Sequence, residues 1–441
     1  MVKRIVLLKD DDQLRLASEE AEFEIAEETL VHELEPEGWN FDRTYTPVPL
    51  EGRSTVLNIR REAEGFDYRE LNLPQEGAKV YVTRVDVENE EAFQRSMRSN
   101  KVVGYFSDLE LEEDAVGEDY CSPAPAAGDW ETVAKKLGVS SLGSTGKNVR
   151  VAVVDGGIAA DDHIKVAGGW TPRGSTGKPG NWPRGHGTMC AFNVLIAAPD
   201  AKILDCALLQ SPEPTVKMLT SDAISCYTNL MRLLKSEPGP LVVNNSWGIY
   251  DLSIDYPVGD PHNYSANIEH PFNQAVLSLI AAGADVLFSA GNCGSNCGRP
   301  NSRCGINNVG PGRSVHGAKA LEDAITVAAI TTDHRRLGYS AQGPGSISNR
   351  KPDLAAYSHF DGSGIYPASQ GGDSGTSTAS PVAGGVVTAL REKFSNSKVN
   401  PYRLKAILQR TAVDLNKDGF DYDIGWGLIN PMGAMEALRQ T

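Results

Sequence analysis

The sequence has 441 residues, of which 40% are hydrophobic and 22% charged, and its formal net charge is -15. This length supports a large core and two or more domains, and the composition is that of an ordinary soluble globular protein, which excludes a disordered or fibrous chain. The negative charge is concentrated in residues 1–120, which hold 30 acidic and 14 basic side chains. This segment is therefore a distinct unit, and we do not expect it to bind nucleic acid.

The N-terminus and the cysteines favour a cytoplasmic protein. The opening residues, MVKRIVLLKDDDQ, have an apolar run that is too short for a secretory signal, and no later stretch is long and apolar enough to span a membrane. The cysteines do not form a fully paired set, and free thiols are the default in a reducing cytosol. They are Cys121, Cys190, Cys206, Cys226, Cys293, Cys297 and Cys304.

Residues 1–111 are predicted to form an acidic α+β domain. A first strand is predicted in VKRIVLL, and a strand, a helix and a second strand then follow in residues 79–87, 88–100 and 101–111. Residues 112–128, EEDAVGEDYCSPAPAAG, are acidic and then rich in Pro, Ala and Gly. This composition predicts an exposed linker, which is a natural place for proteolytic processing.

From residue 129 to the end of the chain, helices and strands are predicted to alternate. A helix at 129–139 leads to RVAVVDGGI, a buried strand that delivers Asp155 at its C-terminal end. A glycine-rich surface loop then leads to His186, which lies between two glycines in RGHGT.

The later part of the chain keeps this alternation. Strands are predicted at 201–209, 241–248, 284–292 and 324–330, and helices at 221–236, 270–283 and, as the last helix, 400–412. Such alternation predicts an α/β fold with a doubly wound, mostly parallel sheet and helices on both faces. Ligands of such sheets bind beyond the carboxyl ends of the strands, where Asp155, Ser246 and Asn292 lie.

The stretch GGDSGTSTASPVAGGVVTAL, residues 371–390, places Ser377 at the start of a small-residue helix. A helix N-terminus presents unpaired N–H groups and a positive dipole, which suit a nucleophile whose reaction develops an oxyanion. Alone, this stretch is better explained as a loop that caps a buried helix. Together with Asp155 and His186, each in its own glycine-bearing motif, it supplies a nucleophile, a general base and an orienting carboxylate.

These motifs resemble those of the subtilisin-like serine endopeptidases. DGGI, GHGT and GTSTASP match the Asp, His and Ser motifs of that family in the same chain order, and FSAGN places Asn292 where the family has an oxyanion-binding amide. The resemblance covers residues 129–441 and implies Asp155, His186 and Ser377 as the catalytic triad. It also implies a catalytic domain over the same residues.

For residues 1–111 the resemblance is one of pattern. Strand, helix, strand and an acidic tail are similar to the family's inhibitory propeptide, whose tail lies in the active-site cleft. We therefore expect this domain, with an N-terminal extension, to act as an intramolecular inhibitor, so that the protein is made as a zymogen. The alternative is an unrelated domain that recognises a substrate or partner.

The resemblance also implies substrate-binding residues. Ser246, Trp247 and Gly248 match the strand that pairs with an extended substrate. Ala290 and Gly291 match the wall of the primary specificity pocket, which we expect to be roomy and apolar. Trp247 departs from the smaller residue usual at its position, so it either narrows the neighbouring subsite or packs against the loop.

Two groups remain open at this level. Cys293, Cys297 and Cys304 form a local disulfide or redox switch, a metal site without an obvious fourth ligand, or packed free thiols. Asp414, Asn416 and Asp418 fit the first half of a calcium loop, but Gly425 stands where a bidentate Glu is required, so an acid-rich turn is favoured. We expect no required cofactor, with Ca²⁺ as a secondary candidate.

The predicted function is that of a serine endopeptidase that hydrolyses protein or peptide substrates through an acyl-enzyme. The alternative from another class is a catalytically blocked pseudoprotease or binding scaffold. The presence of Asp155, His186, Ser377 and Asn292 together argues against this alternative, because a scaffold needs none of the four.

Overall fold

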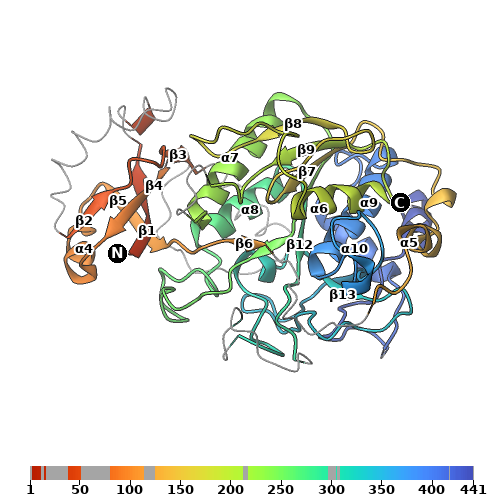
Figure 1. Cartoon of the computed structure of the whole chain (residues 1–441). Helices are drawn as coiled ribbons and strands as arrows, with labels where there is room; N and C mark the ends of the chain where they lie inside the picture. The colour runs from red at the N-terminus through yellow and green to blue at the C-terminus, as the bar shows by residue number, and fades with distance from the viewer. Residues whose placement is uncertain are drawn as a thin grey trace.

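The computed structural model describes residues 2–10, 14–15, 38–50, 80–113, 125–211, 217–295, 304, 308–416 and 418–440. These residues form two units that lie side by side, a small one built from the N-terminal segment and a large one built from the rest (Figure 1). No helix within the described ranges is both long and apolar enough to cross a bilayer.

Seven parallel strands form the central sheet of the large unit, in the order β14-β13-β12-β10-β7-β9-β8. This arrangement confirms the predicted α/β fold with a parallel sheet. The strands are β7 (Arg150–Val154), β8 (Val166–Trp170), β9 (Lys202–Cys206), β10 (Leu241–Asn245), β12 (Asp285–Ser289), β13 (Ile325–Ile330) and β14 (Leu354–Tyr357).

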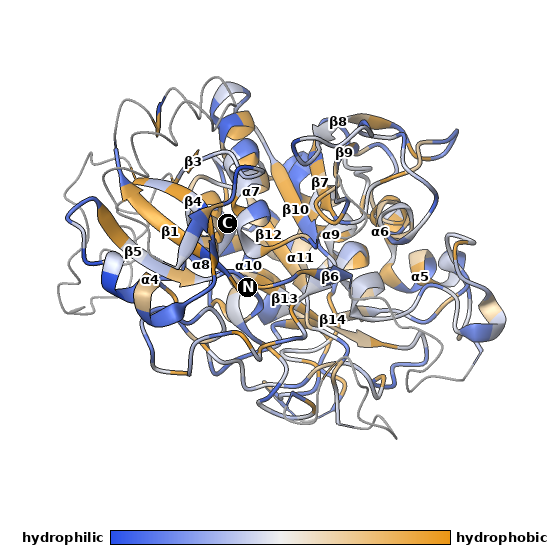
Figure 2. Cartoon of the chain, turned by 60° about the vertical axis from the view of Figure 1, so that its left-hand side comes forward, coloured by the Kyte–Doolittle hydropathy of each residue, from blue (hydrophilic) through white to orange (hydrophobic). Residues whose placement is uncertain are grey.

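Helices cover both faces of this sheet. Val151 and Val153 of β7 pack in one core, and Ala152 and Val154 pack in the other, as alternation along a strand requires. The first core holds α5 (Trp130–Leu137), α6 (His186–Leu195), α9 (Thr376–Lys393), α10 (Pro401–Thr411) and α11 (Pro431–Arg439); the second holds α7 (Thr220–Ser236) and α8 (Pro271–Ala281). Figure 2 shows strands β7 and β10 as an apolar band between these layers.

Three elements of the large unit differ from the sequence prediction. The stretch expected to be a surface loop contains β8, whose Gly168 and Gly169 hide the usual pattern of a strand. Strand β14 has only four residues, which is too short a run to be recognised as a strand from the sequence. Helix α11 follows α10, which was wrongly expected to be the last helix. Short 3-10 helices lie at Val139–Ser141, Gly317–Ala320 and Ala368–Gln370.

The small unit is an antiparallel sheet with one described helix, α4 (Glu90–Ser96). Its strands run in the order β2-β4-β1-β5, with β3 also paired to β4, so β1 is central rather than peripheral. Their bounds are β1 (Val2–Lys9), β2 (Trp39–Phe41), β3 (Val48–Pro49), β4 (Val80–Val87) and β5 (Val102–Ser107).

The two faces of this small sheet have different partners. Val6 and Leu8 of β1 pack with Phe93 of α4 in a core of the unit's own. Ile5 and Leu7 belong instead to the core that includes α7 and α8 of the large unit. The small unit therefore buries a whole sheet face against the large one, as Figure 1 shows beside α7.

Candidate active site

Asp155 and His186 meet at the C-terminal edge of the sheet. Strand β7 ends at Val154, so Asp155 is the first residue beyond it, and α6 begins at His186. His186 Nδ1 lies 2.8 Å from Asp155 Oδ1, and both side chains are buried. The carboxylate also accepts the Gly156 N–H at 2.7 Å. This pairing is the one needed to fix an imidazole so that Nε2 faces a nucleophile.

Two glycines make this approach sterically feasible. A Cβ on Gly187 would lie 2.4 Å from the Gly157 carbonyl oxygen, so only glycine lets the start of α6 approach the loop after β7. A Cβ on Gly385 would lie 2.3 Å from the Val194 carbonyl oxygen, where α9 crosses α6. The motif glycines thus set the spacing between the segments that carry Asp155, His186 and Ser377.

Ser377 is the second residue of α9, at the positive end of the helix dipole. Its Oγ donates to the Ser374 carbonyl oxygen at 3.3 Å. His186 Nε2 is buried and makes no hydrogen bond within the described part of the chain. The carboxylate and imidazole are therefore joined, whereas the hydroxyl is turned toward its own helix start.

Cys190 lies one helical turn after His186 and was not singled out from the sequence. Its Sγ is 3.5 Å from Asp155 Oδ2, 3.9 Å from His186 Nδ1 and 3.6 Å from the Ser377 carbonyl oxygen. The thiol thus bridges all three motifs. Burial raises its pKa to about 12, because the thiolate would lie without water beside Asp155. The i, i+4 spacing from His186 was the available signal.

Asn292 follows β12 and is fully buried beside the start of α9. Its Oδ1 accepts the Thr376 N–H at 2.9 Å and the Thr376 hydroxyl at 3.0 Å. Thr376 Oγ1 also accepts the Gly291 N–H at 3.0 Å. Thr376, another residue not singled out beforehand, therefore fixes the orientation of the amide and turns Nδ2 to the side opposite itself.

The predicted substrate strand is present and is already paired. Strand β11 (Trp247–Gly248) is joined in antiparallel fashion to β6 (Glu112–Glu113), with Glu113 opposite Trp247 and Glu112 opposite Gly248 (Figure 1). Ser246, just before β11, donates its hydroxyl to the Ser377 carbonyl oxygen at 3.0 Å. The segment expected to begin an exposed linker thus begins as a strand in the site, while residues 114–124 lie outside the described ranges.

Trp247 is 1% exposed and belongs to the lining of a pocket beside β11. Its ring packs against Phe272 of α8 and Phe288 of β12, with centroid separations of 5.7 and 5.9 Å. Trp247 therefore packs into the core and not against the loop, and its effect on the neighbouring subsite stays a prediction.

Residues 146–427 match the model of the subtilase family, Peptidase_S8. The chain belongs to the subtilase family of serine endopeptidases. It is 25% identical over 319 residues to fervidolysin from Fervidobacterium pennivorans, which is 68% of this chain and 42% of that protein. It is 28% identical over 301 residues to subtilisin DY from Bacillus licheniformis, which is 68% of this chain and 94% of the relative.

Solved structures show the same fold. The crystal structure of fervidolysin, described as a keratinolytic enzyme related to subtilisin, has a TM-score of 0.59 at 18% identity, over 99% of this chain and 61% of that one. A lanthipeptide protease has a TM-score of 0.51 at 20% identity, over 72% of this chain and all of its own. This subtilase therefore spans less than two thirds of fervidolysin and nearly all of subtilisin DY.

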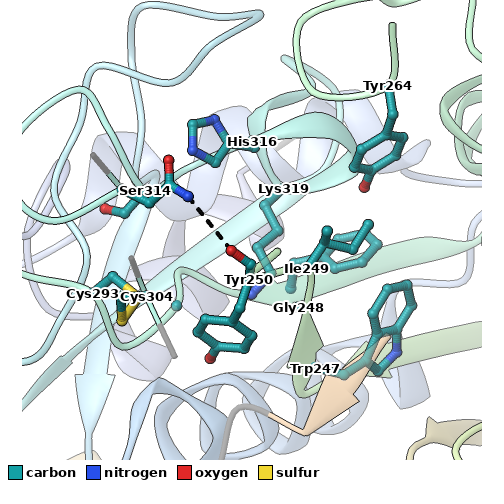
Figure 3. Close-up of a pocket in the computed structure, with 13 residues that line it drawn as sticks. Trp247, Gly248, Ile249, Tyr250, Tyr264, Cys293, Cys304, Ser314, His316 and Lys319 are labelled. Carbon is teal, nitrogen blue, oxygen red and sulfur yellow. Dashed lines mark hydrogen bonds between the residues drawn. A yellow bond between two sulfur atoms is a disulfide. The ribbon is translucent and has the colours of Figure 1, made fainter. Parts of the chain in front are cut away.

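Beside β11, the subtilase has a pocket that was expected to be apolar (Figure 3). Of the two residues expected in its wall, Gly291 lines it. Ala290 does not, because it is buried in a small cluster with Val315 and Ala341. Most of the lining is apolar, as expected, with Trp247, Ile249 and Phe288 among its residues, but the lining also includes His316 and Lys319. His316 directly precedes the 3-10 helix Gly317–Ala320 and Lys319 lies within it, outside the matched motifs.

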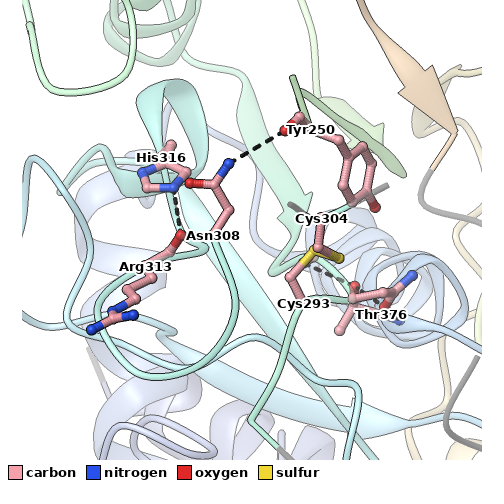
Figure 4. Close-up of a disulfide and its surroundings, with 9 residues drawn as sticks. Tyr250, Cys293, Cys304, Asn308, Arg313, His316 and Thr376 are labelled. Atoms are coloured by element: carbon pink, nitrogen blue, oxygen red, sulfur yellow. Dashed lines mark hydrogen bonds between the residues drawn. A yellow bond between two sulfur atoms is a disulfide. The ribbon is translucent and has the colours of Figure 1, made fainter. Parts of the chain in front are cut away.

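The cysteine cluster of the subtilase contains a disulfide between Cys293 and Cys304, with a Cα–Cα distance of 5.9 Å (Figure 4). Of the three alternatives for this cluster, the local disulfide is therefore the correct one for Cys293 and Cys304. The expectation that cysteines are free thiols was wrong for these two residues. Cys121 and Cys297 lie outside the described residues. The other three, Cys190, Cys206 and Cys226, are free and buried. The cytoplasmic location stays a prediction.

The calcium candidate is an exposed turn after α10. Asp414 accepts the backbone N–H groups of Asn416 and Gly419, and the Asn416 amide donates to Asp421 at 3.1 Å. These are the contacts of an acid-rich turn, as favoured from the sequence. Calcium binding by Asp414, Asn416 and Asp418 stays a prediction.

Proposed function

We propose that this subtilase hydrolyses peptide bonds through an acyl-enzyme formed on Ser377. His186 takes the hydroxyl proton, Asp155 orients the imidazole and stabilises the imidazolium, and the Ser377 N–H and the Asn292 amide stabilise the oxyanion. The observation that carries this proposal is the 2.8 Å contact between His186 and Asp155 beside the N-terminus of α9. Rotation about the Ser377 Cα–Cβ bond would turn Oγ from Ser374 toward Nε2.

We also propose that residues 1–113 inhibit the enzyme within the same chain. The support is the pairing of β6 with β11, which occupies the edge that an extended substrate would use. The small unit anchors this strand through the sheet face that it buries against α7 and α8. In this pairing Glu112 lies opposite Gly248 and Glu113 opposite Trp247, the residue that follows Ser246. We therefore expect the bond that is processed to lie beyond Glu113 in the sequence.

A fluorophosphonate probe and mass spectrometry test both parts. We expect the wild-type chain to be labelled on Ser377 and the Ser377→Ala chain not to be labelled. We expect the wild-type protein to yield a fragment cut within residues 114–124, and Ser377→Ala to keep its full mass. A wild-type chain that is neither labelled nor able to cleave casein, even after the N-terminal segment is removed, would contradict the enzyme assignment.

The rival function, a blocked scaffold, has one observation in its favour. His186 Nε2 makes no hydrogen bond to Ser377. A scaffold would keep this separation after residues 1–113 are removed, whereas the enzyme would close it. The rate of fluorophosphonate labelling after removal of this segment distinguishes the two, because labelling requires a deprotonated or strongly polarised hydroxyl.

The proposed mechanism predicts activity that rises with pH above neutrality. Burial lowers the pKa of His186, but the charge and hydrogen bond of Asp155 outweigh it, so the net pKa lies well above 6.5. Only the neutral imidazole accepts a proton, so kcat/KM should increase as the pH rises through this raised pKa. In Asp155→Asn the pKa of His186 loses the effect of the carboxylate, so the rise of kcat/KM should occur at lower pH. If the rise stays at the same pH, the group that titrates is not His186.

The same shift has a consequence for stability. Because the folded pKa of His186 lies above its unfolded value, the protonated form stabilises the fold. This contribution is complete below the unfolded pKa of about 6.5 and is lost as the pH rises through the folded pKa. Activity and stability should therefore change in opposite directions over this pH range.

A further inference from the structure

The pocket beside β11 lies where the residue on the N-terminal side of the scissile bond must place its side chain. That residue presents its carbonyl to Asn292 and its backbone to β11. Gly248 of β11 forms one side of the pocket, and Gly291 and Cys293, the neighbours of Asn292 in the chain, form another. Figure 3 shows this space between the β11 segment and the disulfide.

Two basic side chains line this pocket. Lys319 is 8% exposed, and its Nζ lies 3.7 Å from the position of a Cβ on Gly291, so the ammonium reaches the wall next to Asn292. Figure 3 shows its side chain extending from the side of His316 toward Tyr250. None of the described residues in the lining carries a carboxylate.

The lining also holds buried polar atoms without hydrogen-bond partners among the described residues. His316 donates from Nε2 to the Arg313 carbonyl oxygen at 2.7 Å, whereas its buried Nδ1 has no partner (Figure 4). The Ser314 hydroxyl is likewise buried and without a partner. Such groups are costly unless something satisfies them, so they point to a ligand that carries a polar group.

A carboxylate that influences His316 is already hydrogen-bonded elsewhere. Asp255 acts on His316 electrostatically. Its two oxygens accept hydrogen bonds from the side chains of Ser107 and Asn263 and from the N–H groups of Tyr264 and Ser265. It is therefore held by the interface with the small unit and does not fill the pocket.

The chain's own segment at the site is acidic. Glu112 and Glu113 pair with β11, and the sequence continues with DAVGED, which adds Asp114, Glu118 and Asp119. A cleft whose strand β11 pairs with two glutamates, and whose wall holds an ammonium next to Asn292, has the charge expected for acidic peptides.

We propose that this pocket selects an aspartate or glutamate side chain immediately before the scissile bond, and that Lys319 is the residue that determines this specificity. The inference rests on the proposed peptidase function. A carboxylate in the pocket accepts a charge-assisted hydrogen bond from Lys319 and satisfies the Ser314 hydroxyl. The neutral amide of glutamine lacks the charge, and phenylalanine supplies neither the charge nor an acceptor for the Ser314 hydroxyl.

Matched fluorogenic peptides that differ only at this residue test the proposal. On the protein as purified, with residues 1–113 displaced by processing, we expect kcat/KM for Glu or Asp to exceed that for Gln or Phe by roughly 10- to 100-fold. Processing of the wild-type chain should likewise leave an acidic residue before the cut. A wild-type preference for Phe, or equal rates for Glu and Gln, would overturn the proposal.

Variants at Lys319 supply the second readout. Lys319→Met should reduce the Glu to Gln ratio to near one, and Lys319→Arg should keep it well above one. The ratio is measured within one preparation, so it does not depend on how much of the protein is folded. Lys165→Met is the matched control, because Lys165 is exposed and far in sequence from the pocket.

The outcomes separate this proposal from the proposed function. If no peptide is cleaved and no fluorophosphonate label appears, the peptidase assignment itself fails. If peptides are cleaved without an acidic preference, or the ratio in Lys319→Met equals that of the wild type, only the pocket assignment fails.

Discussion

Asn292→Ala is expected to lower kcat by about 10²- to 10³-fold with little change in KM, a magnitude established for subtilisin itself. The amide is fully buried and its Oδ1 is held by Thr376, so Nδ2 has a fixed orientation, and the proposed mechanism uses it as an oxyanion donor. The donor interacts with the transition state more strongly than with the substrate carbonyl, and its removal therefore acts on kcat. Steady-state kinetics on one peptide substrate measures both constants.

Thr376→Val gives a graded companion to this variant. It removes the hydroxyl that donates to Asn292 Oδ1 and accepts from the Gly291 N–H, but it keeps the backbone N–H that also holds the amide. We expect a smaller loss of kcat, because the donor is retained and only less well oriented. Asn416→Ala, in the exposed turn after α10, is the control. An Asn292→Ala enzyme with wild-type kcat would remove Asn292 from the mechanism.

The sequence predicts the large unit well because its signals are local. Buried runs such as RVAVV and LVVNN are recognisable as strands of a parallel sheet, and the sheet brings their C-terminal ends to one edge. Asp155 and Asn292 could therefore be assigned to that edge without coordinates. Strand β8 could not, since its glycine pair has low strand propensity, and it is stabilised by pairing with β9 and by the packing of Val166 and Trp170.

The basic residues of the specificity pocket could not be predicted because their position depends on contacts between distant segments. Lys319 lies 28 residues beyond Gly291 in the sequence, and nothing in its immediate surroundings indicates that its ammonium reaches that residue. Occupation of the cleft by an acidic tail was implied by the resemblance to a propeptide, but the residues that pair with β11 had the same limit. Glu112 and Glu113 look like part of a charged linker until the small unit is docked and pairs them with Trp247 and Gly248.

The docking of the small unit depends on a buried charge cluster around Arg84. Its guanidinium in β4 is 4% exposed and contacts Asp108 Oδ2 at 3.3 Å and Asp222 Oδ2 at 2.6 Å. Asp108 in turn accepts the Ser221 N–H at 2.9 Å and so caps α7 from the small unit. Arg84 thus joins a carboxylate of its own unit to one in the first turn of a helix of the large unit.

Arg84→Met is therefore expected to weaken inhibition strongly. Removing one partner of a buried ion pair costs about 3–5 kcal/mol, because the remaining charges stay buried without compensation. Since Asp222 retains some solvent contact, we take the lower value, which corresponds to roughly 100-fold more frequent release of β6 from β11. The measurement is the rate at which a fluorophosphonate labels Ser377 while both units are present, and that rate should rise by about the same factor.

Two comparisons make this result specific. Arg95→Met removes an exposed arginine from α4 of the same unit and should leave the labelling rate unchanged. When Arg84→Met is combined with Asp108→Asn and Asp222→Asn, the labelling rate should fall part of the way back to the wild-type rate. The reason is that neither Asp108 nor Asp222 then leaves an uncompensated charge at the interface. Equal labelling rates in the wild type and Arg84→Met would mean that the apolar face of the small sheet, with Ile5 and Leu7, holds β6 in place without help from the charge cluster.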